Sequence, residues 1–177
     1  IGLNFLTVEF DIAVRPGQTI TAKGYDDVEF LISTNPGESL KPLSQVASGG
    51  ELSRIMLAIK TVLAGRDEID TLIFDEIDTG ISGRTAWKVA EQLSVLSGAH
   101  QVICITHLPQ IAAMADVHFV IEKSSTDDMT ITDIHKVSAE ESLAELARLL
   151  GSDALTEAAL SNAKEMKEQA GMFKETS

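Results

Sequence analysis

The sequence predicts an α/β fold in which a mainly parallel sheet is flanked by helices. Two short apolar segments, residues 71–74 and 101–106, are typical of buried strands, and the first has the pattern of a strand covered on both faces. The stretch between them carries apolar residues at the spacing of one helix face: Ala86, Val89, Ala90, Leu93 and Leu96. A strand, a helix and a second strand in this order indicate a right-handed parallel crossover.

Further elements are expected on the amino-terminal side of this unit. Residues 5–14 and 27–33 alternate imperfectly between apolar and polar side chains around a glycine-containing turn, which favours an antiparallel β element. From Gly50 the apolar residues repeat with the period of a helix, and Gly65 ends that helix.

On the carboxyl-terminal side the sequence predicts a short helix, a hairpin and two longer helices. Pro109 suits the first turn of the short helix. Ser138 and Glu141 have the spacing of a capping box, which marks the start of a helix. The expected bounds are 109–115 for the short helix, 117–122 and 129–137 for the hairpin, and 138–151 and 153–170 for the long helices.

Composition and charge indicate one folded domain that is poorly suited to bind nucleic acid alone. The 177 residues are 44% hydrophobic and 23% charged, as in soluble globular proteins. A formal net charge of -13 repels phosphate backbones at long range. We expect one unit with three parts, which are a β element at 1–34, a core at 43–137 and helices at 138–177.

The sequence favours a cytoplasmic protein without a membrane segment. Its single cysteine, Cys104, lies in an apolar strand and excludes an intrachain disulfide, which fits a reducing compartment. No apolar run approaches the ~18 residues of a membrane helix, and the chain start lacks the basic segment of a signal peptide. Because the chain begins without Met and inside a strand-like pattern, we expect it to be a piece of a longer polypeptide.

A serine and two glycines stand where the first long helix begins, in the sequence Ser48-Gly49-Gly50-Glu51. Exposed backbone N–H groups and the helix dipole make such an end suitable for anions, and glycines let a phosphate approach closely. An isolated Ser-Gly-Gly is more often an ordinary helix cap. The neighbouring motifs decide between these interpretations.

Two adjacent carboxylates, Asp75 and Glu76, follow the apolar strand at 71–74. Asp75 is suited to bind Mg²⁺ beside substrate phosphates, because magnesium prefers oxygen ligands and keeps several waters. Glu76 can polarise an attacking water as a general base. A solvated acidic loop is the alternative, and the pair alone does not exclude it.

His107 stands at the end of the next strand. Neighbouring parallel strands end at one edge of a sheet, so we expect the imidazole beside Asp75 and Glu76. A neutral ring in that place can contact a γ-phosphate or the attacking water. A metal site is disfavoured because the other histidines show no ligand spacing.

The order of these motifs resembles the carboxyl-terminal lobe of an ABC-type P-loop NTPase head. Residues 46–56, 74–84 and 105–116 are similar to the RecN family of bacterial double-strand-break repair proteins, which are SMC-like ATPases. ABC transporters usually follow the catalytic glutamate with Pro-Thr, and SMC heads usually lack a Thr-His pair. The segments 76–80 and 107–110 of this chain therefore favour the RecN family.

The resemblance implies how this lobe would contact a nucleotide. A signature loop would contact the γ-phosphate of ATP held by an opposing protomer, and its residues would be Ser48, Gly49, Gly50 and Glu51. Asp78 to Gly83 would form the D-loop at the dimer seam. Ser82 departs from the broad pattern of ABC-type proteins, many of which carry an aspartate there.

The resemblance also implies a role for each residue at the strand ends. Asp75 would be the Walker B residue that binds Mg²⁺, Glu76 the catalytic base and His107 the switch histidine. The cofactors would be ATP and Mg²⁺, bound by the complete dimeric head. This segment alone would be inactive.

The sequence contains no match to the Walker A pattern G-x-x-x-x-G-K-[ST], which cradles the phosphates of ATP. In RecN-like and SMC-like proteins the lobe with the Walker A motif lies at the amino terminus, beyond a long antiparallel coiled coil. The implied partners are therefore the Walker A lobe of the same protein, a second head in an ATP-joined homodimer, and DNA through the full assembly at the nucleoid.

Two other functions fit part of the sequence. An ABC transporter subunit is disfavoured by the step from Glu76 to Ile77 and by the β element before residue 35. A non-catalytic interaction module would keep the fold without hydrolysing ATP. Membrane fractionation of the parent protein tests the first alternative, and fluorescent-nucleotide binding to a complete head tests the second.

Overall fold

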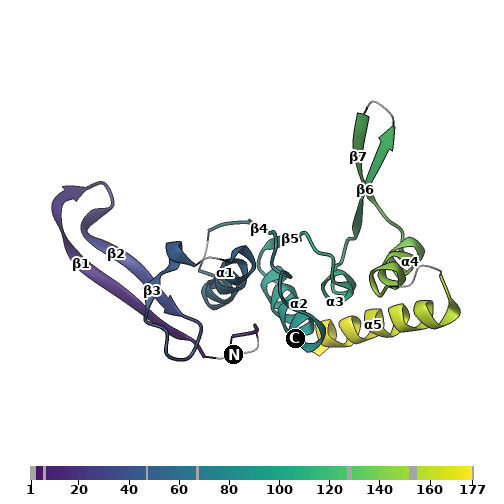
Figure 1. Cartoon of the computed structure of the whole chain (residues 1–177), viewed down its shortest axis with the longest axis horizontal. Coiled ribbons are helices and arrows are strands. Elements are labelled where there is room, and N and C mark those ends of the chain that lie inside the picture. Colours follow the sequence, from purple (N-terminus) through teal and green to yellow (C-terminus); the bar gives the residue numbers. More distant parts are fainter. Residues whose placement is uncertain are drawn as a thin grey trace.

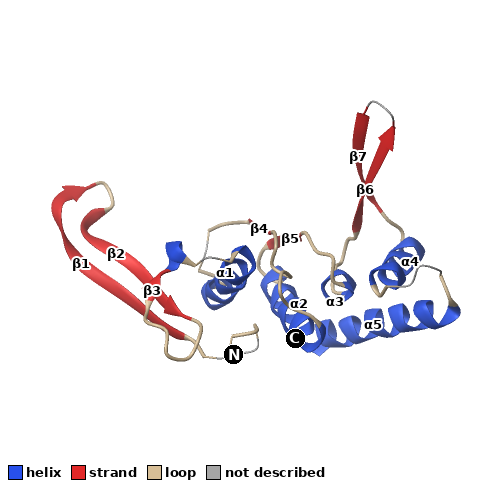
Figure 2. Cartoon of the chain, in the orientation of Figure 1, coloured by secondary structure: helices blue, strands red, loops and turns tan. Residues whose placement is uncertain are grey.

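A computed structural model describes residues 3–5, 7–46, 48–66, 68–126, 129–151 and 155–176. Figure 1 shows an antiparallel sheet at one end, a central unit of helices and parallel strands, and a helical end from which a hairpin projects. Helices and strands both contribute to the molecule, as Figure 2 shows. The predicted α/β class is confirmed.

The antiparallel element is a three-stranded sheet with the order β1-β2-β3. Its bounds are Glu9–Thr21 for β1, Gly24–Ser33 for β2 and Lys41–Pro42 for β3, and a 3-10 turn follows at Leu43–Gln45. β1 pairs Phe10 with Ile32 and continues beyond the predicted end at residue 14. A register shift between Pro16 and Thr21 accompanies this extension, because proline cannot donate a ladder hydrogen bond.

The central unit contains the predicted strand–helix–strand crossover. A helix, α1, precedes it, and the bounds are Gly49–Leu63 for α1, Thr71–Phe74 for β4, Gly83–Ser97 for α2 and Gln101–Cys104 for β5. β4 and β5 pair in parallel, with Thr71 opposite Gln101 and Phe74 opposite Cys104. β5 ends at Cys104 rather than at the predicted residue 106, and Ile105 N still donates to Phe74 O at 3.0 Å.

The described residues cover only one face of this parallel pair. Leu72 and Phe74 are buried in the core, whereas Ile73 is 67% exposed and Ile103 is 44% exposed. The prediction that β4 is covered on both faces is therefore wrong for this chain. An apolar run indicates that a strand suits burial, but it does not show which polypeptide segment covers each face.

The carboxyl-terminal part contains the predicted short helix, hairpin and two long helices. Their bounds are Pro109–Ala113 for α3, Phe119–Thr126 for β6, Met129–Lys136 for β7, Ala139–Leu149 for α4 and Glu157–Thr176 for α5. β6 runs past its predicted end at residue 122, because backbone pairing does not require apolar side chains, whereas β7 ends one residue before its predicted end at 137. Ser138 and Glu141 form the predicted capping box, with Ser138 N donating to Glu141 Oε2 at 2.7 Å.

The last helix differs from its prediction at its carboxyl end. α5 continues to Thr176 instead of ending at residue 170, because Ala170 is buried and Phe173 packs against the core. The predicted start at residue 153 lies outside the described residues. None of the described helices is long and apolar enough to cross a membrane. The division of the chain into three parts stays a prediction.

The main core lies between the central helices and the covered face of β4 and β5. Its largest fully buried helical side chains are Leu57, Val89 and Leu96. Ile77 and Ile81 join this core from the loop after β4. That loop also carries the predicted acidic residues, so its own apolar side chains anchor the site. A second cluster joins α3, α4 and α5.

Candidate functional site

The predicted signature loop forms the amino-terminal end of α1. Ser48 caps this helix, since its Oγ accepts a hydrogen bond from Glu51 N at 3.4 Å. Gly50 is buried against the loop after β4, where an added Cβ would lie 2.9 Å from both Glu76 O and Thr79 O. Backbone contact inside the chain therefore requires glycine at position 50, whatever the loop binds.

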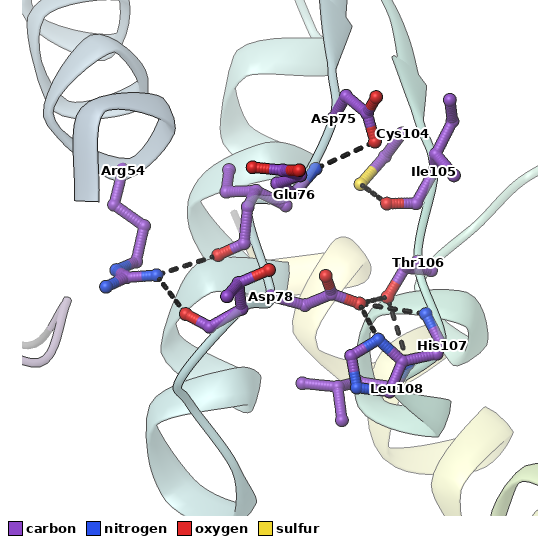
Figure 3. A network of polar contacts seen from close by, with 11 residues as sticks. Arg54, Asp75, Glu76, Asp78, Cys104, Ile105, Thr106, His107 and Leu108 are labelled. Atoms are coloured by element: carbon purple, nitrogen blue, oxygen red, sulfur yellow. Dashed lines mark hydrogen bonds and ion pairs between the residues drawn. The ribbon is translucent and has the colours of Figure 1, made fainter. Parts of the chain in front are cut away.

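Asp75 and Glu76 follow β4 at the edge where the parallel strands end, and both are exposed (Figure 3). Asp75 Oδ1 accepts from Glu76 N at 2.9 Å, and Asp75 O accepts from Ser53 Oγ of α1 at 2.8 Å. Glu76 has a φ of 57°, a left-handed conformation that costs a non-glycine residue about 1–3 kcal/mol. Such strain concentrates at functional sites, and sequence reasoning missed it because no residue pattern encodes it.

Asp78 joins the loop after β4 to the loop after β5. It is only 4% exposed. Its Oδ2 accepts from Thr106 Oγ1 at 2.6 Å and from His107 N at 2.8 Å, and it lies 2.9 Å from His107 Nδ1. Thr106 Oγ1 in turn accepts from Leu108 N at 3.0 Å. The structure thus brings His107 to the end of β4, and its contact there is with Asp78 (Figure 3).

Glu76 and His107 lie apart on this edge. In Figure 3 the Glu76 carboxylate is turned away from the imidazole. It lies against the signature loop instead, since a Cβ on Gly49 would clash with Glu76 Oε2. The predicted cluster of Asp75, Glu76 and His107 is therefore corrected to two pairs on one edge, Glu76 with Gly49 and Asp78 with His107. The physical reason is that the buried Asp78 carboxylate engages the imidazole.

Arg54 is a residue of the site to which the sequence assigned no role. It is 3% exposed, and its Nη1 donates to Ile77 O at 3.1 Å and to Thr79 O at 2.9 Å. Burial lowers the pKa of Arg54, and the Glu51 carboxylate acts in the opposite direction. Arg54 therefore ties the loop after β4 to α1. Its position four residues after Gly50, on the same helix face, is the signal that would have found it.

Cys104 reports the electrostatics at the strand ends. Burial, together with the smaller contributions of the Asp78 and Asp75 charges, raises the pKa of its thiol to about 12. Two carboxylates from the loop after β4 therefore act on one side chain of β5. Negative charge gathers at this edge, which is the setting that a divalent cation needs.

The site fits one magnesium ligand supplied by this chain. Within the described ranges, no group of three or more histidine, cysteine, aspartate or glutamate side chains could hold a metal ion. Magnesium at nucleotide sites is held by one or two carboxylates together with phosphates and waters. The exposed Asp75 meets this requirement, provided that a bound nucleotide supplies the phosphates.

The predicted D-loop has an inner and an outer residue. Asp78 is buried, whereas Ser82 is exposed and precedes α2, with its carbonyl accepting from Thr85 N at 3.2 Å. Gly80 and Gly83 have φ values of 75° and 52°, which only glycine adopts without strain. The Asp78 side chain contacts Thr106 and His107 of its own chain, and the location of this loop at a dimer seam stays a prediction.

The chain is similar to several proteins that are named DNA repair protein RecN. No protein-family model matches the chain. It is 49% identical to the DNA repair protein RecN of Bacillus subtilis over 89% of this chain, 54% identical to that of Treponema pallidum over 81%, and 48% identical to that of Vibrio cholerae over 93%. These matches span 27%, 25% and 30% of the respective relatives.

A solved structure from work on ATP-driven dimerization and DNA stimulated activation of SMC ATPases is a more distant neighbour. It is 20% identical, covers 82% of this chain and has a TM-score of 0.47. The sequence relatives are much closer, at 48% to 54% identity across most of the chain. We conclude that this chain belongs to the RecN family of DNA repair proteins, as a segment that spans less than a third of the length of those relatives.

Proposed function

We propose that this chain supplies part of an ATP-hydrolysing head that acts in bacterial DNA double-strand-break repair. One observation carries the proposal: Asp75, Glu76, His107 and the start of α1 lie at one edge of the β4–β5 pair. The similarity to proteins named DNA repair protein RecN supports the role in DNA repair.

The chemistry follows from the position of each group. Ser48 and the first backbone N–H groups of α1 would contact the γ-phosphate of ATP that an opposing head holds. Asp75 would bind Mg²⁺, which neutralises the charge that develops on the transferred phosphoryl group. Glu76 would turn from Gly49 toward the phosphate and orient the attacking water, and its exposed side chain leaves room for that movement.

The proposed assembly is larger than this chain. A Walker A lobe of the same protein would hold the ATP, and two heads would join as a homodimer around two nucleotides. The signature loop and the D-loop residues Asp78 and Ser82 would lie near the seam. DNA would bind through the full assembly, in the cytoplasm at the nucleoid, since this segment is strongly acidic with a net charge of -13.

The test is Glu76→Gln in a full-length RecN protein that contains this segment. Loss of the general base should lower ATP turnover about 100-fold or more, while ATP binding persists. ATP-bound dimers should then accumulate, as measured by light scattering after size-exclusion chromatography.

A matched control makes the same chemical change elsewhere. Glu165 is exposed on α5, and Glu165→Gln should leave turnover within about twofold of the unmodified protein. Unchanged turnover in Glu76→Gln would count against Glu76 as the catalytic base. Equal losses in both variants would point to an effect of net charge.

A further inference from the structure

We propose that Asp78 is a positioning residue that fixes the orientation and the tautomer of His107. The proposal rests on the proposed ATPase function, because it explains how the histidine of that site is held in position. It begins from one observation: a single buried carboxylate oxygen meets both the backbone and the ring of the same histidine.

The contacts restrict the ring at two points. Asp78 Oδ2 accepts from His107 N at 2.8 Å and lies 2.9 Å from His107 Nδ1. Thr106 Oγ1 donates to the same oxygen at 2.6 Å, which fixes the carboxylate itself. Since Asp78 is 4% exposed, water does not compete effectively for these donors. The imidazole therefore cannot rotate without giving up its contact with Asp78.

The contact also decides which ring nitrogen carries the proton. An ionised carboxylate only accepts hydrogen bonds, so Nδ1 must be the donor. In the neutral imidazole Nε2 then has a free lone pair and acts as an acceptor. The His107 side chain is 71% exposed, so this acceptor is open to a group from outside the chain. A water molecule, which has hydrogens to donate, suits it better than a phosphate oxygen.

Asp78 is itself held from a third element. Arg54 Nη1 donates to Ile77 O and Thr79 O, the carbonyls on either side of Asp78. The side chain of Ile77 is fully buried in the core. The backbone of Asp78 is therefore fixed to α1, and His107 takes its position from Asp78.

The chain contains a matched pair that lacks this support. His135 Nδ1 lies 3.1 Å from Asp133 Oδ2 on β7, but the two side chains are 44% and 70% exposed. Exposed ionic pairs are weak because water competes for both partners. His135 should therefore keep the tautomer ratio of free histidine and can act as an internal reference.

The tautomer is measured by NMR on the 177-residue chain with ¹⁵N-labelled histidine, at a pH where the rings are neutral. Free histidine prefers the proton on Nε2. We expect His107 in the Nδ1–H form, and a return toward Nε2–H in Asp78→Asn, because an amide oxygen is a weaker acceptor than a carboxylate. Asp133→Asn should leave His107 unchanged.

Two results would overturn the proposal, one in the unmodified chain and one in Asp78→Asn. A His107 ring in the Nε2–H form in the unmodified chain overturns it, and so does an unchanged tautomer in Asp78→Asn. If Asp78→Asn does not fold, the His107 tautomer in the unmodified chain and in Thr106→Val tests the proposal. Thr106→Val removes one donor but keeps the carboxylate, so it should retain the Nδ1–H form.

A second measurement separates this proposal from the proposed function. In a full-length RecN protein with this segment, Asp78→Asn should lower kcat for ATP about 10- to 100-fold, as for other residues that orient a functional side chain. KM should stay within about twofold, because the loss concerns hydrolysis and not binding. An altered tautomer with unchanged kcat overturns the positioning role. An unmodified protein without ATPase activity overturns the proposed function, whereas the tautomer result needs no nucleotide.

Discussion

The inner and outer sides of the candidate site are built in opposite ways. On the inner side, Arg54 and Asp78 are buried and bond to groups of their own chain. On the outer side, Asp75, Glu76 and most of the His107 ring are open to solvent. The difference teaches that internal hydrogen bonds fix the shape of the loops, while the reactive groups remain available to ligands from outside. Inner substitutions should therefore lower stability, and outer ones should leave it nearly unchanged.

The largest expected effect concerns the reactivity of Cys104, which lies beneath the two loops. Burial raises the pKa of its thiol from 9.0 to about 12, so the reactive thiolate is scarce. At pH 7.5 iodoacetamide should modify Cys104 roughly 1000-fold more slowly than a free cysteine. Mass spectrometry measures the rate, with the urea-unfolded chain as the reference. Equal rates in the folded and unfolded chains would show that the inner side is open.

The next effect is the loss of Arg54. Arg54→Met removes donors from the carbonyls of Ile77 and Thr79 and should lower the free energy of unfolding by about 3 kcal/mol or more. On the outer side, Ser82 makes no side-chain cap hydrogen bond to described residues. Ser82→Ala should therefore change stability by less than about 0.5 kcal/mol. Urea denaturation measures the free energy of unfolding of both variants. Similar losses in the two would contradict the proposed difference between the inner and outer sides.

A smaller effect separates the two adjacent glycines of the signature loop. A Cβ on Gly50 would press on the backbone of Glu76 and Thr79, so Gly50→Ala should cost about 1–3 kcal/mol. A Cβ on Gly49 would meet only the flexible end of the Glu76 side chain. Gly49→Ala should therefore cost less than about 0.5 kcal/mol. Thermal unfolding compares the stability of the two variants. A larger loss in Gly49→Ala than in Gly50→Ala would contradict the buried position of Gly50.

The smallest effect comes from the strained backbone at Glu76. Its φ of 57° suits glycine better than alanine. Glu76→Gly should be about 1 kcal/mol more stable than Glu76→Ala in urea denaturation. Greater stability of the alanine variant would show that residue 76 does not adopt the left-handed conformation in solution.

Local patterns predicted the central elements well. β4 has the predicted bounds, and its parallel pairing with β5 follows from the crossover rule. The capping box at Ser138 and Glu141 forms because its hydrogen bonds join residues three apart. Predictions failed where distant contacts decide the outcome, as at the end of α5, which Phe173 extends by packing on the core.

The candidate site was predictable in its residue types but not in its internal pairing. Strand ends placed Asp75, Glu76 and His107 at one edge, because parallel strands end together. The sequence did not indicate that Asp78 would contact the imidazole of His107, since these two residues are 29 positions apart. The role of Arg54 also depends on how α1 packs against the loop after β4.

By itself, the sequence determined the strand–helix–strand unit, the family likeness and the residues that carry chemistry. These depend on periodicity and on short motifs, which act over a few residues. Only the tertiary structure decided which groups are buried and which are exposed, and it separated Asp78 from its neighbours Asp75 and Glu76. The physical reason is that burial and hydrogen-bond partners arise from packing between distant segments, and no local pattern specifies them.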